Sequence, residues 1–99
     1  MQQNIGNNDV VLDKKSMRFL LTLDNHTGYV EYRVHETYLD LYHTYVPEGI
    51  EGRGVAASMV RAALKFAKEN NLKIKPTCPY VKRFIERESA LYSDLLLPD

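Results

Sequence analysis

The hydrophobic pattern of the chain changes from a strand period to a helical period at a loop rich in glycine. Residues 38–46 form a β-prone, aromatic run, whereas over residues 53–70 apolar side chains recur at helical spacing. Between the two segments lie Gly49, Gly52 and Gly54. This order predicts a strand, a tight loop and a helix in direct succession. The helix is expected to bury Val55, Met59, Val60, Ala63, Leu64 and Ala67 and to expose Ser58, Arg61, Lys65, Lys68 and Glu69.

A further strand is predicted after this helix. Residues 72–78 are β-prone, with Leu72, Ile74 and Cys78 on one face, and Pro79 ends the run. A strand–helix–strand connection within one sheet is right-handed, so the strands that end at Val46 and Cys78 are expected to be parallel.

The upstream half of the chain reads as an antiparallel meander. Residues 17–23 and 29–35 alternate between apolar and polar side chains, and the turn-forming run 24–28 joins them. After Pro79, apolar residues again follow helical spacing. We therefore expect an α+β fold, in which the meander is followed by a β-α-β unit and C-terminal helices. The whole chain, residues 1–99, is expected to be one domain with a flexible stretch at residues 1–9.

Composition excludes several functional classes. Lys plus Arg and Asp plus Glu both number 13, so the chain lacks the basic bias typical of nucleic-acid and membrane binders. Cys78 is the one cysteine, which rules out an intrachain disulfide and a cysteine-based zinc site. The polar N-terminus does not resemble a signal peptide, and no apolar run has transmembrane length. A cytoplasmic monomer or weak homodimer without a metal is expected.

The glycine loop itself predicts an anion site. Residues 52–57 read Gly-Arg-Gly-Val-Ala-Ala, which fits G-x-G-x-x-A between a strand and a helix. A Rossmann site needs an acidic residue at the end of the next strand, where this chain has Thr77 and Cys78. A P-loop needs Gly-Lys-Ser/Thr, which is absent. A cradle for the pyrophosphate of an acyl-coenzyme A fits best.

These residues resemble the GNAT superfamily of acetyl-CoA-dependent N-acetyltransferases. The superfamily signature is Gln/Arg-x-x-Gly-x-Gly/Ala, and here Gly49 stands where Gln or Arg is usual. The run from about residue 41 to 95 resembles a subgroup of very short members more closely. The matching motifs are His43-Thr44, Val46-Pro47, Gly52-Arg53-Gly54, Cys78-Pro79-Tyr80-Val81 and Tyr92-Ser93-Asp94.

The resemblance implies a GNAT-like fold whose parallel strands splay apart and admit the pantetheine arm of acetyl-CoA. Main-chain groups near Tyr45 and Val46 would pair with the pantetheine amides. The N–H groups of Gly52, Arg53, Gly54, Val55 and Ala56 would receive the pyrophosphate, and the Arg53 side chain would add charge or simply face solvent. The implied reaction moves an acetyl group from acetyl-CoA to a small-molecule or protein amine.

His43 and Cys78 are the candidate catalytic residues. His43 has the parity of Leu39 and Leu41, and both candidates lie near strand ends at one sheet edge, so they are expected to approach each other across the thioester. Two mechanisms are open: direct attack by the amine with His43 or a water as base, or acetylation of Cys78 after its activation by His43. The competing interpretation is that both are ordinary packing residues.

Two questions stay open at this stage. Larger GNATs use a tyrosine to protonate the departing thiolate, and Tyr80 and Tyr92 are both candidates. The small size also admits a different class of function, a CoA-binding regulatory or interaction module without transferase activity.

Overall fold

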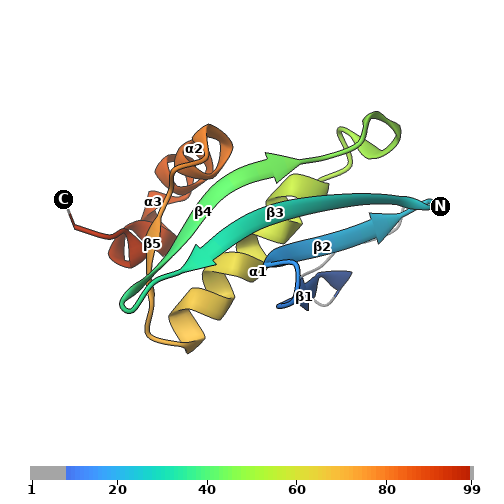
Figure 1. The fold of residues 1–99 in the computed structure, drawn as a ribbon. Coiled ribbons are helices and arrows are strands. Elements are labelled where there is room, and N and C mark those ends of the chain that lie inside the picture. Colours follow the sequence, from blue (N-terminus) through green and yellow to red (C-terminus); the bar gives the residue numbers. More distant parts are fainter. Residues whose placement is uncertain (1–8, 99) are drawn as a thin grey trace.

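The computed structural model describes residues 9–98; the predicted flexibility of residues 1–9 falls outside this range except at Asp9. Within it, five strands form one sheet in chain order (Figure 1). The first four are antiparallel neighbours, and the fifth is parallel to the fourth, as predicted. The strands are β1 (Val11–Asp13), β2 (Arg18–Leu23), β3 (His26–Val34), β4 (Tyr38–Tyr45) and β5 (Lys73–Lys75).

The helices lie on one face and at one edge of this sheet. The long helix α1 crosses the face of β2, β3 and β4, while α2 and α3 lie beside β4 and β5 (Figure 1). After the last helical turn the chain returns to the sheet, where Leu97 N–H donates to the Ile74 carbonyl at 2.8 Å. In the described part of the chain, no helix has the length and apolar character needed to cross a membrane. The helical segments are η2 (Glu48–Ile50), α1 (Val55–Glu69), α2 (Pro79–Arg87), α3 (Ser89–Tyr92) and η3 (Ser93–Leu95).

The core forms between α1 and the sheet, as the sequence pattern predicted. All six residues of the expected apolar face of α1 are at most 2% exposed. One prediction is wrong: Ser58, expected on the polar face, is only 3% exposed. It follows Val55 by three residues and precedes Met59, so it lies within the arc that faces the sheet, where its small side chain lets the helix pack closely. The sheet side of the core is made by Phe19, Leu21, Leu23, Val30, Tyr32, Leu39 and Leu41.

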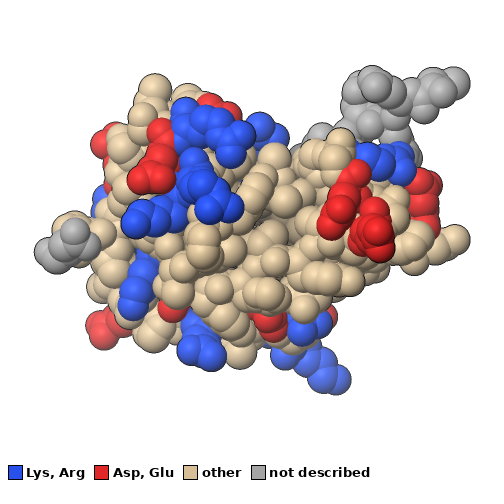
Figure 2. Space-filling model, turned by 90° about the horizontal axis from the view of Figure 1, so that it is seen from above, with Lys and Arg blue, Asp and Glu red and all other residues tan. Residues whose placement is uncertain are grey.

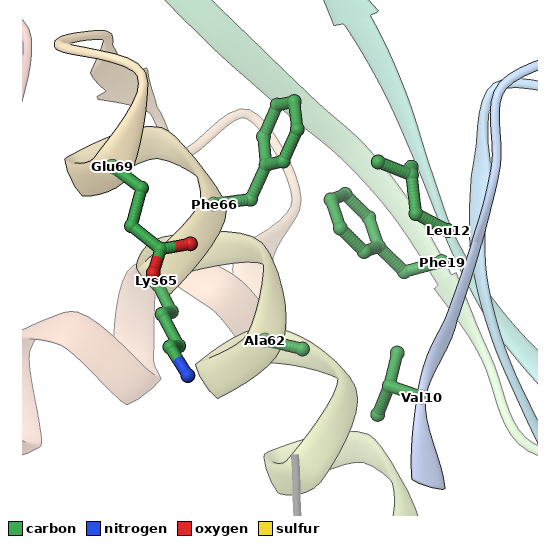
Figure 3. A pocket seen from close by; sticks show the side chains of 7 residues that line it. All are labelled: Val10, Leu12, Phe19, Ala62, Lys65, Phe66 and Glu69. Carbon is green, nitrogen blue, oxygen red and sulfur yellow. The ribbon is translucent and has the colours of Figure 1, made fainter. Parts of the chain in front are cut away.

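The core is open at the edge strand β1. A hollow of about 190 Å³ lies between β1, β2 and α1. Figure 3 shows the side chains that line it, which include Lys65 and Glu69 beside apolar residues. The Phe19 and Phe66 rings meet edge to face across it, with centroids 5.9 Å apart. None of the predicted CoA-binding residues lines this hollow, which is a gap in the packing of a short edge strand. Its lining residues are Val10, Leu12, Phe19, Ala62, Lys65, Phe66 and Glu69.

Tyr32 makes the stability of this core sensitive to alkaline pH. Burial, and then the negative charge of Asp13, raise the pKa of the Tyr32 phenol above its ordinary value of about 10. The folded state therefore holds the proton more tightly than the unfolded chain does. This contribution to stability is complete below about pH 10 and is lost as the pH rises through the folded-state pKa. Urea unfolding at pH 8–11 should show a smaller alkaline loss of unfolding free energy in Tyr32→Phe; equal losses would contradict the assignment.

Candidate functional site

β4 and β5 run side by side only as far as the pair of Asp40 and Lys75. β5 ends at Lys75, so the prediction that this strand reaches Cys78 is wrong. The reason is local: Pro76 has no N–H to continue the ladder, and Thr77 N–H turns back to the Lys75 carbonyl at 3.1 Å. The Thr77 hydroxyl also donates to the Asp40 carboxylate at 2.5 Å, which holds this turn against β4.

Beyond the turn the chain no longer follows β4. Cys78 N–H donates to the Leu41 carbonyl at 2.9 Å, and Cys78 then stands at the N-cap of α2, which begins at Pro79. β4 meanwhile continues to Tyr45. The parallel strands therefore separate, as expected, but one side of the gap is the beginning of a helix rather than a strand.

A bulge in β4 reverses the expected direction of His43. The pairing register shifts between Glu31 and Tyr32 of β3, where β4 carries Tyr42 as an extra residue. One extra residue exchanges the two faces for everything that follows it. Thr44 consequently takes the inward direction, while His43 is exposed on the face away from α1. The prediction that His43 shares the face of the buried leucines of β4 is wrong.

A hollow of about 280 Å³ lies where β4 ends, between the glycine loop, the first turn of α1 and the first turn of α2. It brings together most of the residues expected to bind the cofactor and adds Tyr80 from α2. Two expected cofactor residues, Tyr45 and Arg53, are not part of its lining. The lining residues are Val46, Ile50, Glu51, Gly52, Gly54, Val55, Ala56, Ala57 and Tyr80.

The backbone of the loop requires glycine at two positions. Gly52 and Gly54 have φ of +74° and +80°, in the left-handed region that other residues adopt at a cost. Gly54 is the N-cap of α1, and no side chain within residues 9–98 caps this helix. The first intrahelical bond is donated by Ser58 N–H, to the Gly54 carbonyl. The N–H groups ahead of it, on residues 55–57, are therefore available to an anion.

Cys78 contacts Thr44 rather than His43. Its Sγ lies 3.3 Å from the Thr44 hydroxyl, and the residue is only 6% exposed. It is not among the residues that line the hollow, although Tyr80, two positions later, is. His43 and Cys78 therefore do not form a pair: His43 is exposed on the face of the sheet away from α1, whereas Cys78 is buried.

On the exposed face of the sheet, aromatic side chains lie around His43. The Tyr29 ring lies 5.9 Å from the His43 ring and 5.3 Å from the Tyr45 ring, measured between centroids. The Arg18 guanidinium stacks 4.0 Å above Tyr29 and pairs with the Glu31 carboxylate at 3.2 Å. His43 is thus an imidazole open to solvent, able to accept a proton from a molecule that approaches this face.

The structure separates the two candidate tyrosines. Tyr80 is half-buried in the lining of the hollow, whereas Tyr92 packs its ring 6.0 Å from that of Phe84. Phe84 in turn lies under the Arg61 guanidinium of α1, at 5.4 Å. Tyr92 therefore belongs to the packing of α3 on α2, and Tyr80 alone of the two faces the predicted cofactor site.

Two residues that contact the glycine loop were missed in the sequence. No motif in the sequence marks His26, yet a Cβ built on Gly49 would stand 2.7 Å from its Nε2. Asp24, assigned only to a turn, forms an ion pair with Arg53 at 2.5 Å. The available signal in the sequence was Gly49, because a residue without a side chain leaves room beside the loop for a group from another segment.

Charge is distributed unevenly around the hollow. Figure 2 shows Lys and Arg side chains gathered over the α2 side of the molecule and Asp and Glu side chains toward the loop side. The exposed basic residues of α2 are Lys82, Arg83 and Arg87, and the exposed acidic residues of the loop are Glu48 and Glu51. An anion that approaches the hollow is therefore attracted from the α2 side.

Comparisons with known proteins bear on the family and the fold of this chain. The family model of GCN5-related N-acetyl-transferases matches residues 18–95. Protein NATD1 of chicken is 36% identical over 78 residues, which cover 75% of this chain and 70% of that protein. The zebrafish protein of that name is 38% identical with the same coverage, and the human one is 42% identical over 48 residues, or 48% of this chain and 42% of that protein.

A solved structure has the same fold. The solution NMR structure of a protein from Staphylococcus aureus, described as GCN5-like, superposes with a TM-score of 0.71 at 28% identity. The superposition covers 96% of this chain and 93% of that one. Together with the family match over most of the sequence, this confirms the resemblance drawn from the glycine loop. The chain belongs to the GCN5-related N-acetyltransferase family.

Proposed function

We propose that this protein transfers an acetyl group from acetyl-CoA to an amine. The observation that carries the proposal is the hollow at the end of β4, because a glycine cradle, an uncapped helix start and a tyrosine line one space. Family membership supports the choice of acetyl-CoA as the donor.

Each part of the donor has a partner in the hollow. We assign the pyrophosphate to the N–H groups at Gly54 and in the first turn of α1. The Tyr45 carbonyl lies toward β3, only 3.0 Å from where a Cβ on Gly28 would stand. Since main-chain groups alternate along a strand, those of Thr44 and Val46 point to the other edge of β4, where we assign the pantetheine amides.

The transfer itself needs one base and one acid. The acceptor nitrogen attacks the thioester carbonyl, a C–N bond forms, and the C–S bond breaks. We assign Tyr80 as the acid that protonates the CoA thiolate. His43 lies outside the hollow, so we assign it as the base for an amine that reaches the thioester from the exposed face of the sheet, where it takes the proton directly or through one water. Direct attack is favoured over acetylation of Cys78, because that thiol is buried against the Thr44 hydroxyl and, unlike His43, is not open to solvent.

The test is a transfer assay with acetyl-CoA and a panel of amines, read by release of the CoA thiol, together with calorimetric titration of CoA. Transfer supports the proposal. Binding without transfer would assign the chain instead to the CoA-binding modules without transferase activity, and absence of binding at sub-millimolar CoA would reject both. Intact-mass analysis after incubation with acetyl-CoA decides the route: an acetyl group on Cys78, with transfer lost in Cys78→Ala, would contradict direct attack.

Replacement of His43 by glutamine should lower kcat about tenfold to 100-fold, because it removes a positioned base. The Kd of CoA should stay within about twofold, since the imidazole lies on the sheet face away from the hollow. His35→Gln is the matched control: this histidine stacks on Tyr38 at the opposite end of β4, with centroids 4.4 Å apart, and its loss should leave kcat unchanged. A kcat for His43→Gln equal to that of the control would remove His43 from the mechanism.

A further inference from the structure

The turn between β2 and β3 is a fixed point beside the glycine loop. Asp24 and Asn25 both have positive φ, 51° and 64°, as in a two-residue hairpin turn whose twist matches its strands. The strands are paired up to the turn itself, where Leu23 faces His26. One pair earlier, the hydroxyls of Thr22 and Thr27 are hydrogen-bonded at 2.8 Å. Because these contacts fix the turn to both strands, the turn and the sheet behave as one rigid unit.

This turn contacts the loop at two separate places. Arg53 Nη1 donates to Asp24 Oδ2 at 2.5 Å, which links positions 29 residues apart. The His26 ring lies against Gly49, and its Nδ1 is 2.8 Å from the Asp24 carbonyl. The contacts therefore lie on either side of Gly52, one three residues before it and one directly after it.

The ion pair also gives Arg53 a function other than the expected one. Arg53 is absent from the lining of the hollow, while its neighbours Gly52 and Gly54 belong to it. Its guanidinium is directed toward the sheet turn and is already paired. Because Gly52 and Gly54 have no side chain, the loop backbone can adopt conformations other than the left-handed ones seen here. A contact made by Arg53, which lies between the two glycines, would restrict that range of conformations.

We propose that the β2–β3 turn positions the glycine loop: Asp24 through Arg53, and His26 through Gly49, hold the cradle in its anion-binding shape. The inference rests on the proposed function, since it assigns the held shape to CoA binding. Asp24 and Arg53 are positioning residues here, and the phosphate contacts come from the backbone.

The replacement of Asp24 by asparagine separates this proposal from its main competitor. If Arg53 were a phosphate ligand, Asp24 would compete with CoA for the guanidinium, and its neutralisation would strengthen binding. Removal of a negative charge near an anion site acts in the same direction. A positioning role predicts the opposite sign, because the loop loses its link to the turn. The sign of the change in Kd therefore decides between the two.

The experiment measures the Kd of CoA by calorimetry for the wild type, Asp24→Asn, Arg53→Gln and the double variant. We expect each single variant to bind about threefold to fivefold more weakly, in line with the modest strength of an exposed ion pair. The double variant should bind no more weakly than Arg53→Gln, because the pair acts as one unit. Binding by Asp24→Asn that equals or exceeds the wild type would overturn the proposal.

A matched control and a second measurement complete the test. Asp13→Asn also removes one carboxylate from a turn, where it bonds to Ser16 at 2.8 Å away from the loop, and should leave the Kd unchanged. Hydrogen exchange of the amides of residues 49–54, without ligand, should be faster in Asp24→Asn and Arg53→Gln than in Asp13→Asn. If the wild type does not bind CoA, the proposed function is refuted. The exchange rates measured without ligand still test the contact between the turn and the loop, and equal rates in all variants would refute that contact.

Discussion

Substitution of Gly54 by valine is expected to weaken CoA binding at least about 100-fold. With φ at +80°, this position is open to glycine but costs an L-residue about 1–2 kcal/mol, and a β-branched residue more. Apart from its two chain neighbours, no atom of residues 9–98 lies within 4 Å of the added Cβ, so the effect comes from the backbone and not from a clash. To relieve the strain, the backbone at the N-cap rotates, and the N–H groups of the next residues no longer point toward one anion. Loss of two charge-assisted hydrogen bonds, at about 1.5–3 kcal/mol each, accounts for the expected factor.

The control for this prediction is Asn71→Val. Asn71 also has a positive φ, 57°, but it follows the C-terminal end of α1, the end away from the cradle. Both variants should lose thermal stability, and Gly54→Val alone should lose affinity in a calorimetric titration. If both variants bind CoA as the wild type does, the pyrophosphate does not occupy the cradle.

The parts of the fold that follow from local pattern were predictable from the sequence. Alternation along the meander and the helical period after the loop are set by which side chains must be buried, and both patterns are strong here. The element order that results is sufficient to place a glycine loop at the end of a strand and before a helix. The cradle residues Gly52, Gly54, Val55 and Ala56 accordingly meet in one hollow.

The errors arise where one residue changes the register. The alternation of β4 reads smoothly from Tyr38 to Tyr45, and nothing in its composition marks Tyr42 as an extra residue, because a bulge is defined by the partner strand. Parity therefore placed His43 inward, while the sheet places Thr44 there and brings it to Cys78. Pro76 did carry a signal, since a proline inside a predicted strand argues for an edge or an end.

The contacts of the loop with the β2–β3 turn could not be predicted for a different reason. Asp24 and Arg53 are 29 residues apart, and each is unremarkable in its own segment. The same is true of His26 and Gly49. Their proximity depends on how far β2 and β3 extend beyond the N-terminal end of α1, and no local sequence pattern encodes that distance.

Tyr80→Phe is expected to lower kcat by about 100-fold while leaving the Kd of CoA within about twofold. Tyr80 is half-buried and lines the hollow from the first turn of α2. Positioned proton transfer contributes about 10²–10⁴-fold, and a thiolate is a good leaving group, so the lower end of that range applies here. The ring itself stays in place, 6.4 Å from Phe84, so the packing of the hollow is preserved. Stopped-flow measurement of CoA release with a saturating amine tests the prediction.

The matched variant is Tyr92→Phe, because its ring also packs against Phe84 but lies outside the hollow. It should retain the wild-type kcat. Equal rates for Tyr80→Phe and Tyr92→Phe would mean that solvent protonates the thiolate. A loss with Tyr80→Phe that disappears when the donor carries a more acidic thiol would instead identify Tyr80 as the acid, because such a thiolate leaves without help. The hollow would then be assigned chemistry as well as binding, and its position between the glycine loop and the first turn of α2 would account for both.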